Sequence, residues 1–190
     1  MQMIYVKATS NQIDEIMAVY SAAITAMEDS GIHQWDEIYP DKSTVANDIC
    51  KNQMYVGIID NKIAVCFALS EDCDEQYKNG KWAYPNSKFC VIHRLCVSPE
   101  FQHKGIASQA MSYIEKHCKS AGYNSIRLDC FTLNPYSKRL YDKAGYKVVG
   151  YADWRKGKFE LREKILLTAL DLSVTSSENE TELFCKDFKT

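Results

Sequence analysis

The sequence predicts one mixed α/β domain in which helices flank a β-sheet. Three observations indicate this fold class: helical patterns come early in the chain, two apolar strands form a hairpin in the middle, and strands and helices alternate afterwards. The chain has 190 residues, which is enough for one domain with a buried core and too few to favour two. We expect the domain to span residues 1–170.

The first segment predicts a short strand, "VKAT", followed by a helix. Thr9 and Gln12 have the spacing of a capping box, in which two side chains satisfy the free N–H groups at a helix start. Apolar residues then recur at helical spacing, and Gly31 is expected to end the helix. A second, shorter helix is expected to follow Asp41 or Ser43.

The middle of the chain predicts a β-hairpin and then a long loop. The apolar segments "MYVGII" and "IAVCFAL" flank residues 60–62, "DNK", which are typical turn residues. Residues 71–87 are polar and include a glycine and a proline, so we expect a loop.

The second half predicts alternating strands and helices. Asn134 followed by Pro135 is a strong helix-start signal, because asparagine caps free N–H groups and proline fits the first turn. The expected elements are, in order, a strand at 88–97, a turn at 102–105, a helix ending near Gly122, the strand "SIRLDCF", the helix after Asn134, and strands near 146–152 and 158–168. Residues 171–190 are rich in Ser, Thr and Glu, and we expect a polar appendage whose composition is compatible with disorder.

Composition and charge argue against several classes of function. The net charge of −2 disfavours nucleic-acid binding by bulk electrostatics. No apolar run is long enough to span a membrane, and the first residues lack the apolar core of a signal peptide. We therefore expect a cytoplasmic protein with neither nucleic acid nor membrane as a partner. The eight cysteines include no C-x-x-C pair, so we expect free thiols and no metal site.

The turn at residues 102–108, "QHKGIAS", joins a strand to a helix. The first N–H groups of a helix have no partner, and a glycine lets a ligand approach the backbone closely. The helix dipole favours an anion there, most often a phosphate. The segment matches neither a P-loop nor a dinucleotide fingerprint. On spacing alone, a glycine that simply makes the turn possible is an equally good interpretation.

Two blocks of the second half resemble the GNAT superfamily of acetyl-CoA-dependent N-acetyltransferases. The first family block, Q/R-x-x-G-x-G/A, is matched by Gln102, Gly105 and Ala107, with alanine where many members have glycine. The second, N-x-x-[AS]-x-x-L-Y-x-K-x-G-[FY], is matched by Asn134, Ser137, Leu140, Tyr141, Lys143, Gly145 and Tyr146. The match is close over residues 88–152, and the order of elements agrees from residue 3 to about 168.

This resemblance implies a fold, a cosubstrate and a set of binding residues. The fold would have a central, twisted, mostly antiparallel sheet whose two central strands splay apart, flanked by helices. Acetyl-CoA would be the cosubstrate. Its pantetheine arm would pair with backbone groups of the strand, and its pyrophosphate would be held by N–H groups of the turn. The implied residues are Leu95, Cys96, Val97, Gln102, His103, Lys104, Gly105, Ile106, Ala107, Ser108, Asn134, Ser137 and Tyr141.

The resemblance also implies catalytic residues. Tyr141 would act as the general acid near the sulfur, although its helix position also fits a buried core aromatic. His93 would serve as the base, because histidine has a suitable pKa, but a structural histidine is the alternative. Strand alternation places His93 on the face of Val91 and Leu95, with Arg94 on the opposite face.

The acceptor substrate is the part of the expected function that the sequence determines least. The segment "GIHQWDEIYP" lies between the first two helices, which in this family form the wall of the acceptor cleft. Its residues Trp35, Asp36 and Tyr39 would offer an aromatic and acidic surface suited to binding a cation. Packing of the helix connection explains Trp35 and Tyr39 equally well. The expected function is transfer of acetyl to a primary amine of a small molecule or peptide, by direct attack in a ternary complex. A non-catalytic acyl-CoA-binding sensor or interaction module remains the alternative, and a homodimer remains open.

Overall fold

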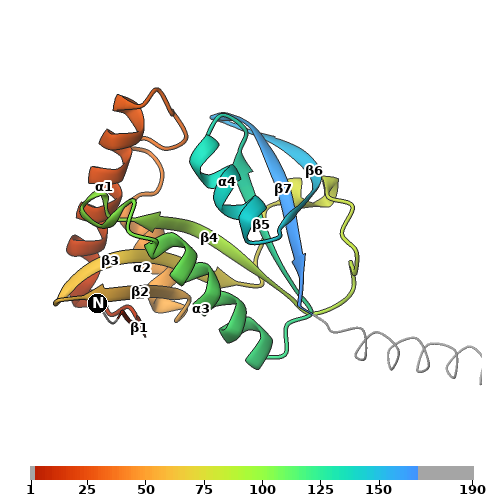
Figure 1. Cartoon of the computed structure of the whole chain (residues 1–190), viewed down its shortest axis with the longest axis horizontal. Helices are drawn as coiled ribbons and strands as arrows, with labels where there is room; N and C mark the ends of the chain where they lie inside the picture. Colours follow the sequence, from red (N-terminus) through yellow and green to blue (C-terminus); the bar gives the residue numbers. More distant parts are fainter. Residues whose placement is uncertain (1–2, 167–190) are drawn as a thin grey trace, which may run out of the picture.

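The structure, a computed structural model, describes residues 3–166. These residues form a seven-stranded sheet with helices on both faces (Figure 1), which confirms the predicted mixed α/β fold. The strands are β1 (Ile4–Lys7), β2 (Met54–Ile59), β3 (Lys62–Ser70), β4 (Phe89–Val97), β5 (Ser125–Phe131), β6 (Lys147–Trp154) and β7 (Gly157–Ile165); the helices are α1 (Ile13–Asp29), α2 (Lys42–Cys50), α3 (Ile106–Ser120) and α4 (Pro135–Lys143). The expected domain end near residue 170 and the appendage at 171–190 lie outside the described residues.

The two central strands, β4 and β5, run parallel and stay paired only briefly. The sheet order is β1-β2-β3-β4-β5-β7-β6, and every other neighbouring pair is antiparallel. Only Phe89, Cys90 and Val91 of β4 pair with β5. Beyond Val91 the strands part, so the remaining edge of β4 has no strand partner on that side. This is the splayed pair that the resemblance implies.

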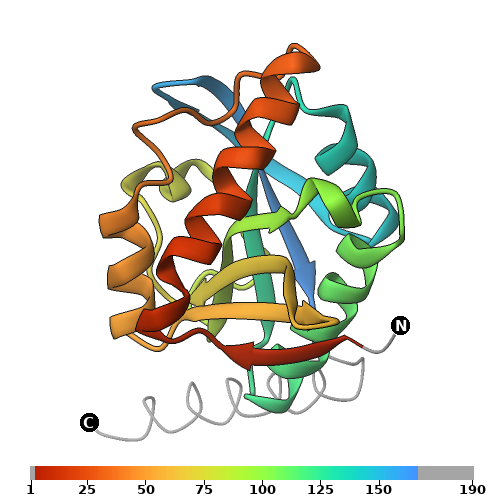
Figure 2. The ribbon, with the colours of Figure 1, turned by 90° about the vertical axis from the view of Figure 1, so that its left-hand side faces the viewer.

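The two faces of the sheet carry different helices and separate cores. Helices α1 and α2 cover one face, and α3 and α4 cover the other (Figure 2). Five buried cysteines are part of these cores, and all seven described cysteines are free thiols. No helix in residues 3–166 combines the length and the apolar character needed to cross a membrane.

The predicted local signals recur in the structure. The Thr9 N–H donates to Gln12 Oε1 at 3.0 Å at the start of a 3-10 turn that leads into α1. Gly31, with φ at +72°, follows the end of α1. Asp41 caps α2 by accepting from the Thr44 N–H at 2.9 Å. These signals act through the backbone nearby, which is why the sequence alone could reveal them.

The loop at residues 71–87 is more ordered than its polar composition predicts. It contains a 3-10 turn, Glu75–Asn79, whose Tyr77 is only 3% exposed. Tyr77 packs against Val91, Ala152 and Leu161. The loop therefore closes the sheet face that α1 and α2 leave uncovered, and one aromatic side chain supplies much of that contact.

A bulge in β4 changes which face its side chains occupy. Cys66 of β3 pairs with Cys96, and Ala68 pairs with His93, so one residue of β3 lies opposite two of β4. The extra residue is Arg94, with φ at +53°. A bulge shifts the alternation of a strand by one position, and Leu95 accordingly packs on the α3 face.

Arg94 lies on the opposite side, where it bonds Asp48 of α2. Together with His93, it lines a cavity on that side. The prediction that His93 shares a face with Leu95 and opposes Arg94 was therefore wrong, because regular alternation cannot anticipate the inserted residue.

A buried ion-pair network attaches α4 to the sheet. The Arg162 side chain on β7 is 2% exposed and donates from Nε to Glu160 Oε2 at 2.8 Å. It also bonds Asp142 of α4 at 2.6 Å, and Lys138 of the same helix reaches Glu160 at 3.1 Å. The network therefore fixes the position of Tyr141, which lies on α4 between Lys138 and Asp142.

We predict that Arg162→Met lowers the free energy of unfolding by about 3–5 kcal/mol, because it leaves a buried carboxylate without its main partner. Urea denaturation measures this. Adding Glu160→Gln should restore most of the loss. The control Lys62→Met removes an exposed ion pair with Glu100 and should cost less than about 1 kcal/mol. An equal, small effect of both single variants would contradict a structural role for the network.

Candidate active site

A cavity of about 570 Å³ opens where β4 and β5 part. Its walls come from the α1–α2 loop, α2, the segment at 70–77, β4, β5, α4 and the β6–β7 hairpin. Tyr141, Leu95, Tyr77, Asp129 and Trp154 are among its lining residues. The cavity therefore joins residues that are far apart in sequence at the point where the sheet is open.

Tyr141 is a buried phenol that faces this cavity. Helix α4 begins with Asn134, whose Oδ1 accepts the N–H groups of Tyr136 and Ser137, both at 3.1 Å. Tyr141 is 7% exposed, and burial raises its pKa above the ordinary value. Its hydroxyl makes no hydrogen bond with the described residues. A protonated phenol that lines a cavity can donate a proton to a group bound there.

Asn134 and Ser137 have structural contacts besides their predicted binding roles. Asn134 Nδ2 donates to Gln34 Oε1 at 2.9 Å, which connects α4 to the α1–α2 loop. Ser137 Oγ donates to the Asn134 carbonyl at 3.2 Å and lies 3.2 Å from Cys130 Sγ. The cap at Asn134 is present, while contact of either residue with a cosubstrate stays a prediction.

His93 lines the cavity as a neutral imidazole. Its Nε2 lies 3.0 Å from the Asp72 carbonyl oxygen and 3.2 Å from Ser70 Oγ. Burial, assisted by the charge of Arg94, lowers the pKa of His93 to about 4. Because Nε2 faces a carbonyl, it carries the proton, and Nδ1 is left as the acceptor. The role of His93 as a base stays a prediction.

Asp129 is a cavity carboxylate that the sequence reasoning missed. It lies on β5, and its Oδ1 accepts from the Tyr77 hydroxyl at 2.9 Å. Burial raises the pKa of Asp129 to about 6. No cation of residues 3–166 lies within ion-pair distance of it. The available signal was a lone acidic residue inside the apolar strand "SIRLDCF".

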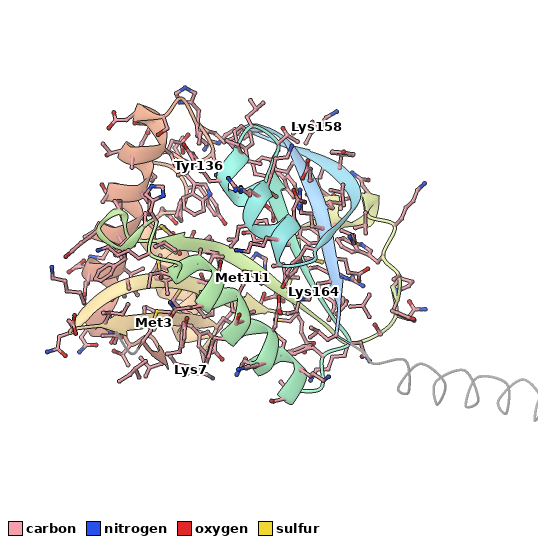
Figure 3. The ribbon with its side chains drawn as sticks, viewed as in Figure 1. Met3, Lys7, Met111, Tyr136, Lys158 and Lys164 are labelled. Atoms are coloured by element: carbon pink, nitrogen blue, oxygen red, sulfur yellow. The ribbon has the colours of Figure 1, made fainter. Side chains whose placement is uncertain are left out.

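The turn at 102–108 presents backbone donors beside the end of β4, and of these the Gln102 N–H already donates to the Pro99 carbonyl at 3.3 Å. Gly105 caps α3 with φ at +77°, and a Cβ placed on it would meet nothing within 4 Å. The Gln109 N–H bonds the Gly105 carbonyl at 3.1 Å, so the preceding N–H groups of α3 lie before the first such helical bond. Met111 on α3 and Tyr136 on α4 mark the two helices on this face of the sheet (Figure 3).

The three predicted acceptor residues differ in their surroundings. Trp35 and Tyr39 line the cavity, and Tyr39 accepts from Arg94 at 2.9 Å. Asp36 is not among the lining residues. Its carboxylate binds Arg155 through two bonds of 2.7 Å and Lys156 at 3.1 Å, and Arg155 holds the pKa of Asp36 well below its usual range. Asp36 therefore attaches the α1–α2 loop to the β6–β7 hairpin.

Comparison with known proteins agrees with this geometry. The model of the acetyltransferase (GNAT) family matches residues 17–146, and the chain belongs to this family. A GNAT-family acetyltransferase of Streptococcus agalactiae superposes with a TM-score of 0.75 and 26% identity, covering 86% of this chain and 95% of the other. A search of curated proteins found no match.

Two more distant structures support the fold. The PaiA N-acetyltransferase of Thermoplasma acidophilum, solved in complex with coenzyme A, has a TM-score of 0.66 and 19% identity, covering 87% of this chain and 99% of the other. The ribosomal-protein-S18-alanine N-acetyltransferase of Escherichia coli has a TM-score of 0.65 and 10% identity, covering 88% and 96%.

We predict that Asp129→Asn raises the Tm increasingly as the pH rises from about 4 to about 7. The folded state binds the Asp129 proton more tightly than the unfolded state, because its pKa is about 6 instead of 3.8. Ionisation therefore costs stability over this pH range, and asparagine avoids the cost. Thermal unfolding at several pH values measures the difference from the wild type.

Asp72→Asn is the control, because Asp72 is exposed and paired with Lys51, which lowers its pKa. This variant should show no such gain. A Tm difference for Asp129→Asn that does not change with pH would mean that the Asp129 pKa is ordinary.

Proposed function

We propose that the protein is an acetyl-CoA-dependent N-acetyltransferase that transfers acetyl to a primary amine by direct attack in a ternary complex. The observation that carries this proposal is the position of the Tyr141 cavity, which opens where β4 leaves β5 and near the strand that leads to the free turn at 102–108. A thioester bound along β4 would bring its sulfur toward this cavity.

The residues present fit acetyl-CoA. Leu95, Cys96 and Val97 lie on the stretch of β4 that has no partner toward β5, so their backbone groups could pair with the pantetheine amides as an added strand does. The Gln102 N–H donates to the Pro99 carbonyl at 3.3 Å, so the N–H groups from His103 through Ser108 would hold the pyrophosphate, beside the open space at Gly105. Asn134 and Ser137 would contact the pantetheine arm from α4.

The chain would supply both proton transfers. Acetyl-CoA, when bound, provides an activated acetyl group and a thiolate as the leaving group. Asp129 would take one proton from the acceptor ammonium, since its pKa of about 6 lies near neutral pH. As the carbon–sulfur bond breaks and the carbon–nitrogen bond forms, Tyr141 would give its proton to the sulfur. The new amide nitrogen releases a second proton, which restores the Tyr141 hydroxyl through solvent.

His93 is the second candidate for the base. Its pKa of about 4 makes it a weaker proton acceptor than Asp129 at neutral pH, and Ser70 and the Asp72 carbonyl already hold one of its nitrogens. We therefore assign the proton transfer from the acceptor ammonium to Asp129, and we assign His93 the role of a neutral residue that lines the cavity.

A thiol-release assay with acetyl-CoA and a broad panel of amines tests the proposal. The expected result is amine-dependent release of coenzyme A with a matching yield of acetylated amine. Binding of acetyl-CoA without any turnover would indicate the non-catalytic module instead.

We predict that Gly105→Val weakens acetyl-CoA binding by at least ~10-fold, because a side chain would occupy the space where the pyrophosphate meets the backbone. Calorimetry measures the affinity. Gly122→Val is a matched control: Gly122 has φ at +76° and open space like Gly105, but lies at the far end of α3. Both variants carry the same backbone strain, so equal affinities in the two would overturn the assignment of the turn.

We predict that Tyr141→Phe lowers kcat by at least ~10-fold, a cautious floor under the ~10²–10⁴-fold typical of general acids. Only the hydroxyl is removed, so acetyl-CoA affinity should persist. Tyr146→Phe is the control, because Tyr146 is a neighbouring buried tyrosine whose hydroxyl has no partner and is not among the lining groups. Turnover reduced equally by both changes would make Tyr141 a packing residue.

A further inference from the structure

The charged side chains that line the cavity differ in whether they have a partner of opposite charge. Four cations line it, and each already has a carboxylate partner within the chain. These pairs are Lys51–Asp72 at 3.3 Å, Arg94–Asp48, Arg155–Asp36 at 2.7 Å and Lys156–Asp36 at 3.1 Å. A ligand carboxylate that bound the enclosed Arg94 would have to compete with Asp48 for its guanidinium.

Two cavity carboxylates, by contrast, have no cation among the described residues. Asp129 accepts a hydrogen bond from the Tyr77 hydroxyl at 2.9 Å, and Asp74 accepts one from Trp154 Nε1 at 3.0 Å. Neither forms an ion pair within residues 3–166. A carboxylate held by one neutral donor keeps capacity for a cation, because it can accept several hydrogen bonds.

The two carboxylates lie at different depths in the cavity. Asp129 is on β5, one of the two strands that part at the cavity, and is half-buried. Asp74 is in the loop that follows β3 and is exposed. Asp74 therefore lies closer to solvent than Asp129 does.

Aromatic rings complete this part of the wall. Tyr77 and Trp154 pack edge to face with ring centroids 6.3 Å apart, and Trp154 packs in the same way on Phe159 at 5.2 Å. All three residues line the cavity. Ring faces attract ammonium groups and accommodate alkyl chains, whereas they offer nothing to a carboxylate.

We infer that the acceptor is an aliphatic diamine or longer polyamine without a carboxylate, with its reacting nitrogen at Asp129 and a second ammonium at Asp74. This inference rests on the proposed function and names the substrate class of the same site. The alkyl chain would lie along Tyr77 and Trp154. The two ammonium groups would supply the cations that the two carboxylates lack.

The buried Arg94 pair disfavours binding of a substrate carboxylate at Arg94. The side chains of Arg94 and Asp48 are only 10% and 6% exposed, so a substrate carboxylate that took Arg94 would leave Asp48 buried and unpaired, at considerable cost. Arg155 and Lys51 are 52% and 50% exposed and are the lining cations that could turn toward a carboxylate. The experiment therefore compares acceptors that differ by that group alone.

The test compares cadaverine with lysine and putrescine with ornithine, since each pair differs only by the α-carboxylate. Pentylamine, which lacks the second ammonium, is the third arm. We expect kcat/KM for each diamine to exceed kcat/KM for the matching amino acid by at least ~10-fold. We expect the same ratio between cadaverine and pentylamine, because ~10-fold is the value of about one charge-assisted hydrogen bond. Calorimetry of cadaverine binding to the protein with coenzyme A gives a readout that is independent of turnover.

Two variants identify the carboxylate that holds the second ammonium. Asp74→Asn should lower kcat/KM for cadaverine by at least ~10-fold and leave that for pentylamine nearly unchanged. Glu75→Gln removes one carboxylate charge at the next residue, on an exposed side chain that is paired with Lys78 and is not among the lining residues, and should affect neither amine.

The outcomes separate the two proposals. The diamine class would be overturned if lysine or pentylamine were turned over as well as cadaverine, or if cadaverine did not bind. In either case, binding of acetyl-CoA would still support the acetyltransferase. Failure to bind acetyl-CoA would instead remove the proposed function and this inference with it.

Discussion

The open cavity depends on the bulge at Arg94. One extra residue bends a strand and increases its twist, and here it lies just beyond the last residue of β4 that pairs with β5. The bulge is held from three elements: Tyr20 of α1 donates to the Arg94 carbonyl at 2.9 Å, Asp48 of α2 binds its guanidinium, and Tyr39 accepts from it at 2.9 Å. Both the free edge of β4 and the nearby cavity wall therefore depend on one buried arginine.

The rest of the site is supported from the other half of the sheet. The buried pair of Arg162 and Glu160 holds α4, and Tyr77 in the long loop both seals the sheet and bonds Asp129. Stability and function make opposite demands at Asp129, because a half-buried carboxylate without a cation costs folding free energy until a ligand supplies one. Such a group is easier to explain as part of a binding site than as part of the core.

The sequence predicts a structural feature well when the residues that determine the feature are neighbours along the chain. The cap at Asn134, the turn at Gly31 and the hairpin at residues 60–62 are local, and the structure confirms them. The prediction of the fold and of the splayed central strands came from two motifs, whose spacing reflects the architecture that the family shares. The bulge at Arg94 reversed the alternation expected for Leu95. The contact of Tyr77 with Asp129 joins residues 52 positions apart, and no local pattern encodes such a pairing.

A crystal structure of the complex with coenzyme A measures the central claim most directly. The pantetheine arm should lie between β4 and β5 and pair with the backbone of Leu95 to Val97, and the sulfur should lie within hydrogen-bond reach of the Tyr141 hydroxyl. A coenzyme A bound outside the β4–β5 opening, or with its sulfur remote from Tyr141 and the Asp129 cavity, would contradict both the assignment of the acid and the location of the reaction.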